Sequence, residues 1–180
     1  AFPELGSNAR EMAHRLDLDA DAFLHLRNMA RGEIAFWGAP MDVESLEFLE
    51  PIEVDGFYVP AGCNTDFPLL ELVCSRNRPV YVSTGACDAE EVSEIVRLGR
   101  NCDVFLLHGV ACFPTPAEES QLQMLDWLKQ FDRPLGFDDH EDGVLAAPVA
   151  VAKGARVLQK RLTLDRRLPG ADHAHSFEPD

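Results

Sequence analysis

Five consecutive residues place one imidazole among four carboxylates. The run Asp138-Asp139-His140-Glu141-Asp142 follows a short apolar segment. Carboxylate oxygens and an imidazole nitrogen are ligands that divalent cations accept in proteins. The same carboxylates would raise the pKa of His140 by stabilising its imidazolium form. A solvated acidic loop is the other interpretation, and the spacing alone leaves both open.

Basic and histidine-containing segments follow this cluster. Lys160-Arg161 and Arg166-Arg167 could bind a phosphate or a carboxylate, or could be ordinary surface charges. His173 and His175 share a segment with Asp172, which is typical of an exposed polar tail more often than of a ligand set.

Motifs of several large enzyme classes are absent from the sequence. It contains no G-x-S-x-G, H-E-x-x-H, P-loop or G-x-G-x-x-G pattern, so serine-hydrolase, zinc-protease, NTPase and dinucleotide-binding functions have no support. The segment Ser83-Thr84-Gly85 could donate hydrogen bonds to an anion, or could be a turn that caps the next helix.

Short apolar runs recur along the chain and predict buried strands. Each is brief and uninterrupted, as expected of a parallel strand that is covered on both faces. They are Ile34–Trp37, Phe57–Pro60, Val80–Ser83, Val104–His108, Leu135–Phe137 and Arg156–Leu158.

Segments with helical spacing lie between these runs, and several follow an aspartate that can cap a helix. The predicted helices are Ala20–Ala30, Val43–Leu49, Phe67–Cys74, Ala89–Leu98, Ser120–Phe131 and Gly143–Ala152. Strands that alternate with helices predict a parallel sheet, and the even spacing favours a TIM-type (β/α) barrel. An eight-unit barrel typically needs about 250 residues. The 180-residue chain is therefore expected to hold one domain, residues 1–180, with the last six barrel units, its first strands missing.

Composition narrows the partners and the compartment. A formal net charge of −15 disfavours nucleic acid and anionic membranes, since both require a basic face. No apolar run approaches the roughly 18 residues of a membrane helix. The chain has five cysteines and no C-x-x-C pair, which favours reduced thiols in a cytoplasmic protein.

Seven segments, taken in order, resemble motifs of the sialic acid synthase family from about residue 34 to the end of the chain. No single motif is decisive, but their order and spacing agree. They are Ala39–Ser45, Gly62 with Phe67–Leu70, Pro79–Gly85, Phe105–His108 with Phe113–Pro116, Gly136–His140, Lys160–Arg166 and Leu168–His173.

The resemblance implies a carbon–carbon bond-forming transferase of carbohydrate biosynthesis. The family condenses phosphoenolpyruvate with N-acetylmannosamine or its 6-phosphate. A divalent metal, Mn²⁺ or Mg²⁺, polarises the sugar aldehyde as a Lewis acid. The ligands implied for this chain are therefore a sugar or a phosphoenolpyruvate-like molecule, and a homodimer is the implied assembly.

Carried over by position, the resemblance assigns roles to individual residues. His140 stands at a metal-binding histidine and Asp172 at an aspartate that faces the sugar, so both are expected to be catalytic, with His140 also the metal ligand. The positions expected to contact substrate are Asp138, Asp139, Lys160, Arg161 and Phe113.

Other positions depart from the family pattern. Arg161 replaces the second metal-binding histidine, and a guanidinium cannot ligate a cation. Tyr58 replaces a phosphoenolpyruvate-binding lysine, and Asp138 replaces a serine; Ala61 and Cys63 replace a serine and an acid. These changes predict weak or absent Mn²⁺ binding.

The same departures predict an ion pair that takes the metal's place. Arg161 is expected to pair with Asp138 or Asp139 across the barrel mouth. Two functions stay open: a divergent synthase with another substrate, and a catalytically degenerate barrel that binds a sugar or a protein.

Overall fold

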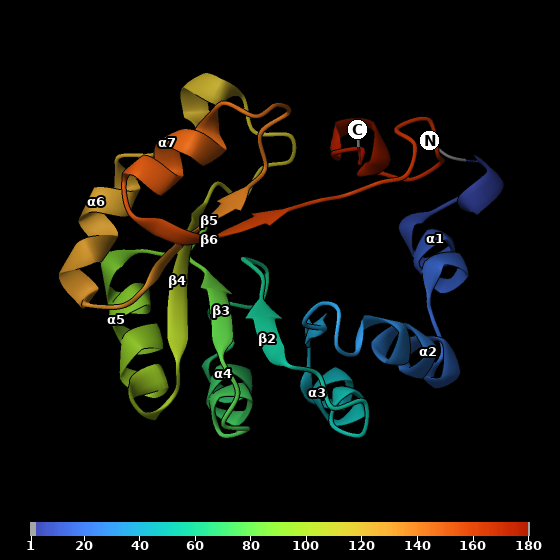
Figure 1. Ribbon diagram of the computed structural model, residues 1–180, viewed down its shortest axis with the longest axis horizontal. Coiled ribbons are helices and arrows are strands. Elements are labelled where there is room, and N and C mark those ends of the chain that lie inside the picture. Colours follow the sequence, from blue (N-terminus) through green and yellow to red (C-terminus); the bar gives the residue numbers. More distant parts are fainter. Residues whose placement is uncertain (1–2, 180) are drawn as a thin grey trace.

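A curved parallel sheet forms the centre of the molecule. The structure, a computed structural model, describes residues 3–179. The six strands pair in chain order and all run parallel. They form a curled half-barrel (Figure 1), which confirms the predicted TIM-type architecture. The strands are β1 (Trp37–Gly38), β2 (Gly56–Val59), β3 (Val80–Ser83), β4 (Val104–Gly109), β5 (Leu135–Asp139) and β6 (Ala155–Lys160).

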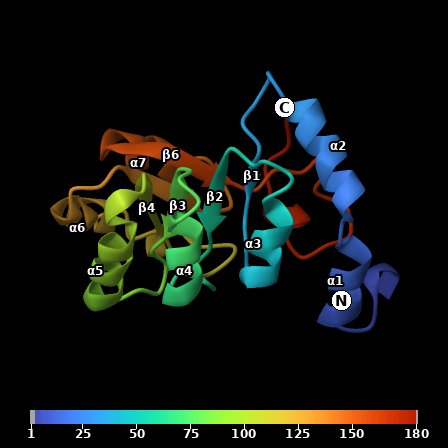
Figure 2. The ribbon, with the colours of Figure 1, turned by 90° about the horizontal axis from the view of Figure 1, so that it is seen from below.

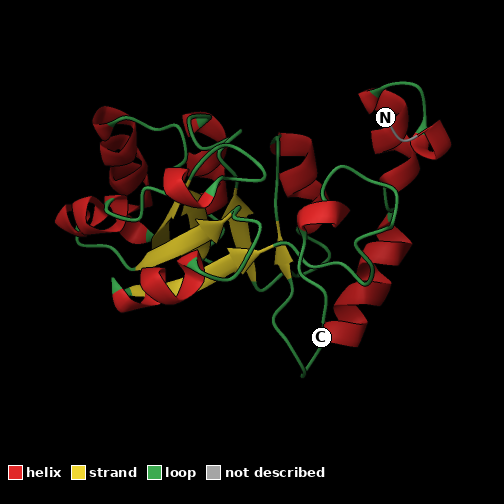
Figure 3. Ribbon diagram, turned by 90° about the horizontal axis from the view of Figure 1, so that it is seen from above, coloured by secondary structure: helices red, strands yellow, loops and turns green. Residues whose placement is uncertain are grey.

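Helices lie around the sheet, and two further helices stand at one side of the molecule (Figure 2). The α-helices are α1 (Ala9–Leu16), α2 (Ala20–Ala30), α3 (Val43–Leu49), α4 (Phe67–Cys74), α5 (Ala89–Leu98), α6 (Met124–Leu128) and α7 (Ala146–Ala152). Short 3₁₀ turns are Pro3–Leu5, Gly99–Asn101, Ala117–Glu119, Lys129–Phe131 and His173–His175. Both ends of the described chain lie on the side of the molecule that carries α1 and α2 (Figure 3).

Aspartate caps begin the helices of the central units, as the sequence predicts. The side chains of Asp42, Asp66 and Asp88 each accept a backbone N–H in the first turn of α3, α4 and α5. An N-cap of this kind contributes roughly 1 kcal/mol because it satisfies a donor that has no partner within the helix. These caps fix where each strand-to-helix loop ends.

Two predicted helices are shorter in the structure. Within the predicted helix Ser120–Phe131, the α-helix covers only Met124–Leu128, and Gln121 has φ +47°, outside helical geometry. The helix predicted from Gly143 begins at Ala146. The apolar pattern is correct in both places, but it marks the buried face and not the helix ends.

The core lies between the sheet and its helices. Leu46, Leu70, Ile95, Leu106 and Leu125 are among its fully buried side chains. Because strand side chains alternate between faces, every second residue points to the helices and the others point to the concave side of the sheet. The carboxyl ends of the strands, with the loops that follow, therefore carry the polar groups that meet at the barrel mouth.

Candidate functional site

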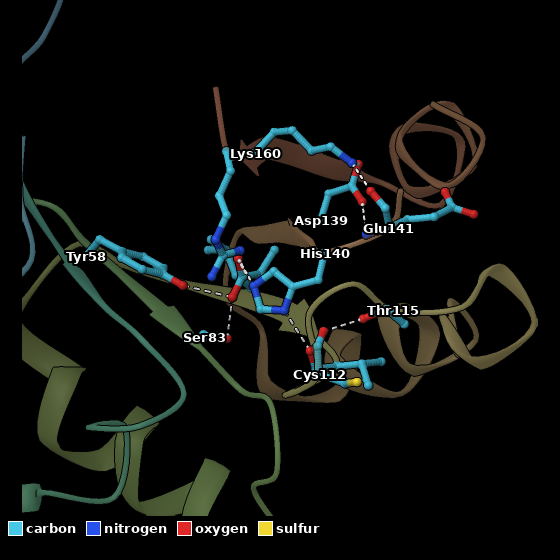
Figure 4. A network of polar contacts seen from close by, with 12 residues as sticks. Tyr58, Ser83, Cys112, Thr115, Asp139, His140, Glu141 and Lys160 are labelled. Carbon is cyan, nitrogen blue, oxygen red and sulfur yellow. Dashed lines mark hydrogen bonds and ion pairs between the residues drawn. The ribbon is translucent and has the colours of Figure 1, made fainter. Parts of the chain in front are cut away.

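A buried carboxylate lies at the centre of the barrel mouth. Asp138, near the end of β5, is only 1% exposed. Its Oδ2 atom accepts hydrogen bonds from the hydroxyls of Tyr58 on β2, at 2.8 Å, and Ser83 on β3, at 2.7 Å. Tyr58 and Ser83, from two strands, and His140, from the loop directly after β5, point toward one another (Figure 4). The contacts tie β2 and β3 to β5 across the concave face.

His140 forms an ion pair with the same carboxylate. Its Nε2 atom lies 3.3 Å from Oδ1 of Asp138, and its Nδ1 atom lies 2.8 Å from the carbonyl oxygen of Val110. Burial alone would lower the pKa of His140, but the contact with Asp138 and its charge raise it overall. Since a carbonyl oxygen only accepts, Nδ1 carries a proton. The geometry fits an imidazolium facing a carboxylate.

The acidic partner shifts in the complementary direction. Burial alone would raise the pKa of Asp138, but His140 and the two hydroxyl donors lower it overall. Burial, together with the Asp138 charge, raises the pKa of Tyr58, so its hydroxyl stays protonated and donates. The mouth therefore contains a charged pair, Asp138 and His140, which hydrogen bonds from Tyr58 and Ser83 stabilise.

Asp139 and Lys160 pair on the opposite face of β5. Lys160 Nζ lies 3.1 Å from Oδ2 of Asp139, donates to the carbonyl of Gly143 at 3.1 Å and also contacts the carbonyl of Glu141. It lies 4.3 Å from the centroid of the Phe177 ring. These contacts hold the loop between β5 and α7. The substrate-binding role predicted for Asp139 and Lys160 stays a prediction.

Arg161 lies over an aromatic ring at the edge of the mouth. Its Nε atom is 2.9 Å from Oδ2 of Asp172, and its guanidinium carbon is 4.0 Å from the centroid of the Phe113 ring. The Phe113 ring meets the rings of His140 and His175 edge to face, with centroids 5.8 and 6.0 Å apart. Four predicted site residues, Phe113, His140, Arg161 and Asp172, are therefore brought together.

The predicted pairing of Arg161 with Asp138 or Asp139 is wrong. Its carboxylate partner is Asp172. Asp138 is already occupied by His140 and two hydroxyls, and Asp139 points to the other face of β5, where Lys160 meets it. The alternation of side chains along β5 accounts for the orientation of Asp139.

The two tail histidines face separate partners. His173 Nδ1 lies 2.8 Å from the Thr163 hydroxyl, and His175 Nδ1 lies 3.1 Å from Oδ2 of Asp142. These contacts fold the tail back toward the loop that follows β5.

The residues at the mouth do not fit a divalent cation. His140 uses Nδ1 toward the Val110 carbonyl and turns Nε2 toward Asp138, and its neighbour Arg161 is a permanent cation. Within residues 3–179, no group of three or more His, Cys, Asp or Glu side chains is arranged to hold a metal ion.

Sequence reasoning did not anticipate two contributors: Tyr58 donates to Asp138, and Gln159 lies directly opposite Asp138 in the β5–β6 register. Ser83 was named as a possible hydrogen-bond donor to an anion, and it donates to the Asp138 carboxylate. A usable signal was present, because the lysine-to-tyrosine and serine-to-aspartate departures fall at strand ends that face one another. The Tyr58 hydroxyl compensates for the burial of the Asp138 carboxylate by donating a hydrogen bond to it.

A separate cavity of about 350 Å³ lies beside β4, against α5 and α6. Its lining includes His108, Cys87, Met124 and Trp127 and contains no Asp, Glu, Lys or Arg side chain. His108 Nε2 donates to the carbonyl of Ser120 at 2.8 Å. Burial lowers the pKa of His108, although Ser120 and the Asp138 charge oppose the shift. The side chain is a neutral, buried histidine.

Among the helices described, none has the length and apolar character required to cross a membrane.

Comparison with known proteins identifies relatives along nearly the whole chain. An N,N'-diacetyllegionaminic acid synthase of Campylobacter jejuni is 32% identical over 176 residues, covering 94% of this chain and 53% of the relative. The N-acetylneuraminate-9-phosphate synthase of Drosophila melanogaster is 32% identical over 180 residues, covering 97% of this chain and 48% of the relative. The chain spans about half the length of the curated relatives it matches.

A solved structure agrees with this result. The N-acetylneuraminic acid synthetase of Leptospira borgpetersenii, solved in complex with citrate, superimposes with a TM-score of 0.90 at 27% identity. The match covers 98% of this chain and 64% of that protein. The sequence pattern of the NeuB family matches residues 3–180 of this chain. The chain is related to enzymes that make sialic acid and similar nonulosonic acids, and it belongs to the NeuB family.

Proposed function

We propose that this chain uses the NeuB barrel to bind a small polar ligand at its mouth, and that its residues do not support the metal-assisted condensation of phosphoenolpyruvate with an amino sugar. The observation that carries the proposal is the buried Asp138 carboxylate, held by Tyr58, Ser83 and His140. It places negative charge where the family resemblance implies a bound anion.

Electrostatics disfavours a phosphate at this point. A carboxylate about 4 Å from one negative charge costs about 4 kcal/mol at an effective dielectric constant near 20. His140 offsets part of this cost, but its charge is already paired with Asp138. Tyr58, in place of a lysine, supplies a neutral hydroxyl that is itself committed to the carboxylate.

The cation at the mouth comes from the protein. Arg161 stands where the resemblance implies a second metal-binding imidazole, and it holds its position through Asp172 and Phe113. A guanidinium binds carboxylates well but cannot act as a Lewis acid toward an aldehyde. A Mn²⁺ or Mg²⁺ cofactor is therefore not part of the proposed function.

The proposal also includes the ligand, the assembly and the compartment of the protein. The ligand is a sugar or a small anion of the kind that the relatives' names imply, and the assembly is a homodimer. All five cysteines are unpaired, which supports a reducing, cytoplasmic compartment.

A synthase assay tests the proposal. The intact protein is incubated with phosphoenolpyruvate, N-acetylmannosamine and Mn²⁺, and the release of inorganic phosphate is followed together with the nonulosonic acid product. We expect no product above the protein-free control. Mn²⁺-dependent product would refute the proposal and support the divergent synthase, which the retained His140 and Asp172 favour.

A further inference from the structure

Buried polar atoms without hydrogen-bond partners gather at one place in the molecule. Among the described residues, four side-chain atoms are both buried and without such a partner. Two of them, Asp138 Oδ1 and Arg76 Nε, have ion-pair partners in His140 and Glu50; the other two are Gln159 Oε1 and Arg161 Nη1. Atoms of this kind are rare in folded proteins and often mark the place of a ligand or an ordered water molecule.

These two atoms form one patch with Asp138 on neighbouring strands. Asp138 of β5 and Gln159 of β6 are direct partners in the parallel register. Arg161 lies two residues beyond Gln159 and therefore on the same face of the strand. The patch lies beside free space, since Gln159 and Tyr58 line a cavity of about 310 Å³ on the concave side of the sheet.

The aromatic wall of that cavity adds a second feature. Trp37 and Tyr81 line it, and their rings stack with centroids 3.9 Å apart. Such a wall provides an apolar surface for the carbon skeleton of a ligand, while the polar atoms of the patch bind its substituents.

The chemistry of the two atoms defines a ligand class. Gln159 Oε1 requires a hydrogen-bond donor, whereas Arg161 Nη1 requires an acceptor. A hydroxylated carboxylate offers both, because its hydroxyls donate and its carboxylate pairs with the guanidinium. Inorganic phosphate offers mainly acceptors and is repelled by Asp138.

A divalent cation fits this patch less well than the hydroxylated carboxylate. It could meet the oxygens of Asp138 and Gln159, but it would lie close to the permanent positive charge of Arg161, which follows Gln159 by two residues on the same face of the strand. Like charges at such a separation repel each other.

We propose that Gln159 and Arg161 form a metal-free subsite for a hydroxylated carboxylate, with Arg161 binding the carboxylate and Gln159 Oε1 accepting a hydrogen bond from a hydroxyl. The inference rests on the proposed function, because it names the ligand class of the same barrel mouth. It assigns Arg161 the role of carboxylate anchor.

Three six-carbon probes measure separately what the carboxylate and the hydroxyls of the ligand contribute to binding. The intact protein is titrated calorimetrically, in EDTA, with gluconate, with hexanoate, which lacks the hydroxyls, and with sorbitol, which lacks the carboxylate. We expect gluconate to bind at least roughly tenfold more tightly than either of the others, since each part supplies hydrogen bonds that the other probes lack. Replacing EDTA with Mn²⁺ should leave the gluconate affinity unchanged.

Matched variants assign the contacts. Arg161→Gln should weaken gluconate binding roughly tenfold to a hundredfold, as expected for a lost charge-assisted contact. Arg167→Gln removes the same charge from an exposed side chain paired with Asp165 and should bind gluconate as the unchanged protein does. Gln159→Leu should weaken gluconate and leave hexanoate unaffected. Circular dichroism confirms that each variant is folded, and Arg161→Lys, which keeps the charge but loses the planar fork, provides a second measure for Arg161.

Several results would overturn the inference: no binding of gluconate, binding only with Mn²⁺, equal affinities for gluconate and hexanoate, tighter binding of inorganic phosphate, or equal effects of the Arg161→Gln and Arg167→Gln changes. These results differ from a failure of the proposed function, which is detected as synthase product. Absence of gluconate binding without turnover refutes the subsite alone.

Discussion

The Nε atom of Arg161 lies 2.9 Å from Oδ2 of Asp172, and the guanidinium rests on the ring of Phe113. The contact joins the residue after β6 to the tail and to the loop after β4. The guanidinium of Arg161 is a permanent organic cation, and it occupies the position at which the family resemblance implies a metal ligand.

The replacement of the metal site should be reversible by substitution. The double change Asp138→Ser and Arg161→His frees Nε2 of His140 and supplies a second imidazole. We expect Mn²⁺ affinity to rise at least roughly tenfold over the unchanged protein, since imidazole nitrogens are good ligands for such ions. Calorimetric titration with Mn²⁺ measures the change. The single Asp138→Ser variant is the control, because the Arg161 cation remains; equal Mn²⁺ affinity in all three proteins would contradict the prediction.

Loss of the Asp138 carboxylate should destabilise the fold strongly. Asp138→Ala leaves a buried imidazolium and two hydroxyls without their acceptor. Breaking one side of a buried pair typically costs roughly 3–5 kcal/mol. Urea denaturation at neutral pH gives the free energy of unfolding. Ser83→Ala, which removes one of two hydroxyl donors, is the comparison and should cost about 1 kcal/mol. A similar loss in both variants would show that the carboxylate is not the centre of the network.

Lys160 should control the mobility of the loop between β5 and α7. Lys160→Met removes the contacts to Asp139 and to the carbonyls of Glu141 and Gly143. We expect faster hydrogen exchange at the amides of residues 141–146, with a cost of roughly 1–3 kcal/mol for the orphaned acceptors. Mass-spectrometric hydrogen exchange measures this directly. Lys129→Met removes a surface pair with Asp126 and should have little effect. Unchanged exchange in the loop would rule out the clamp.

The pH dependence of stability should include a contribution from His108. Burial holds the pKa of His108 below its usual value. The unfolded chain therefore takes up this proton first as the pH falls below about 6.5. The stability contribution is fully present above that pH and is lost as the pH falls through the lowered pKa of the folded state.

His108→Gln tests this contribution, since a glutamine amide can still donate to the Ser120 carbonyl but does not titrate. Unfolding free energies of both proteins are measured between pH 7 and pH 5. The loss on acidification should be smaller in the variant, and parallel curves would exclude His108 as the cause.

Local sequence determined much of the fold. Asp88 before the apolar spacing of Val92 and Ile95 specifies the start and the buried face of α5, and the structure shows both. Short apolar runs such as Val80–Ser83 specify buried parallel strands, because such a run can be covered on both faces only within a sheet flanked by helices. These features depend on residues close together in the chain.

The positions at which helices begin and end were harder to predict from the sequence. The apolar spacing in the segment 120–131 indicates a helix, but the chain turns at Gln121 and the α-helix is only Met124–Leu128. Periodicity reports which face is buried, whereas the end of a helix depends on loop geometry and on contacts such as the one between His108 and the Ser120 carbonyl.

The candidate site also depends partly on the local sequence and partly on the tertiary structure. The sequence by itself determined which groups are present at the strand ends, among them His140, Arg161 and Asp172. Only the tertiary structure decided that Arg161 pairs with Asp172 and that Asp138 is held by Tyr58 and Ser83. The reason is physical: neighbours at the barrel mouth are far apart in the chain, and their pairing depends on strand register and on which face of its strand each side chain occupies.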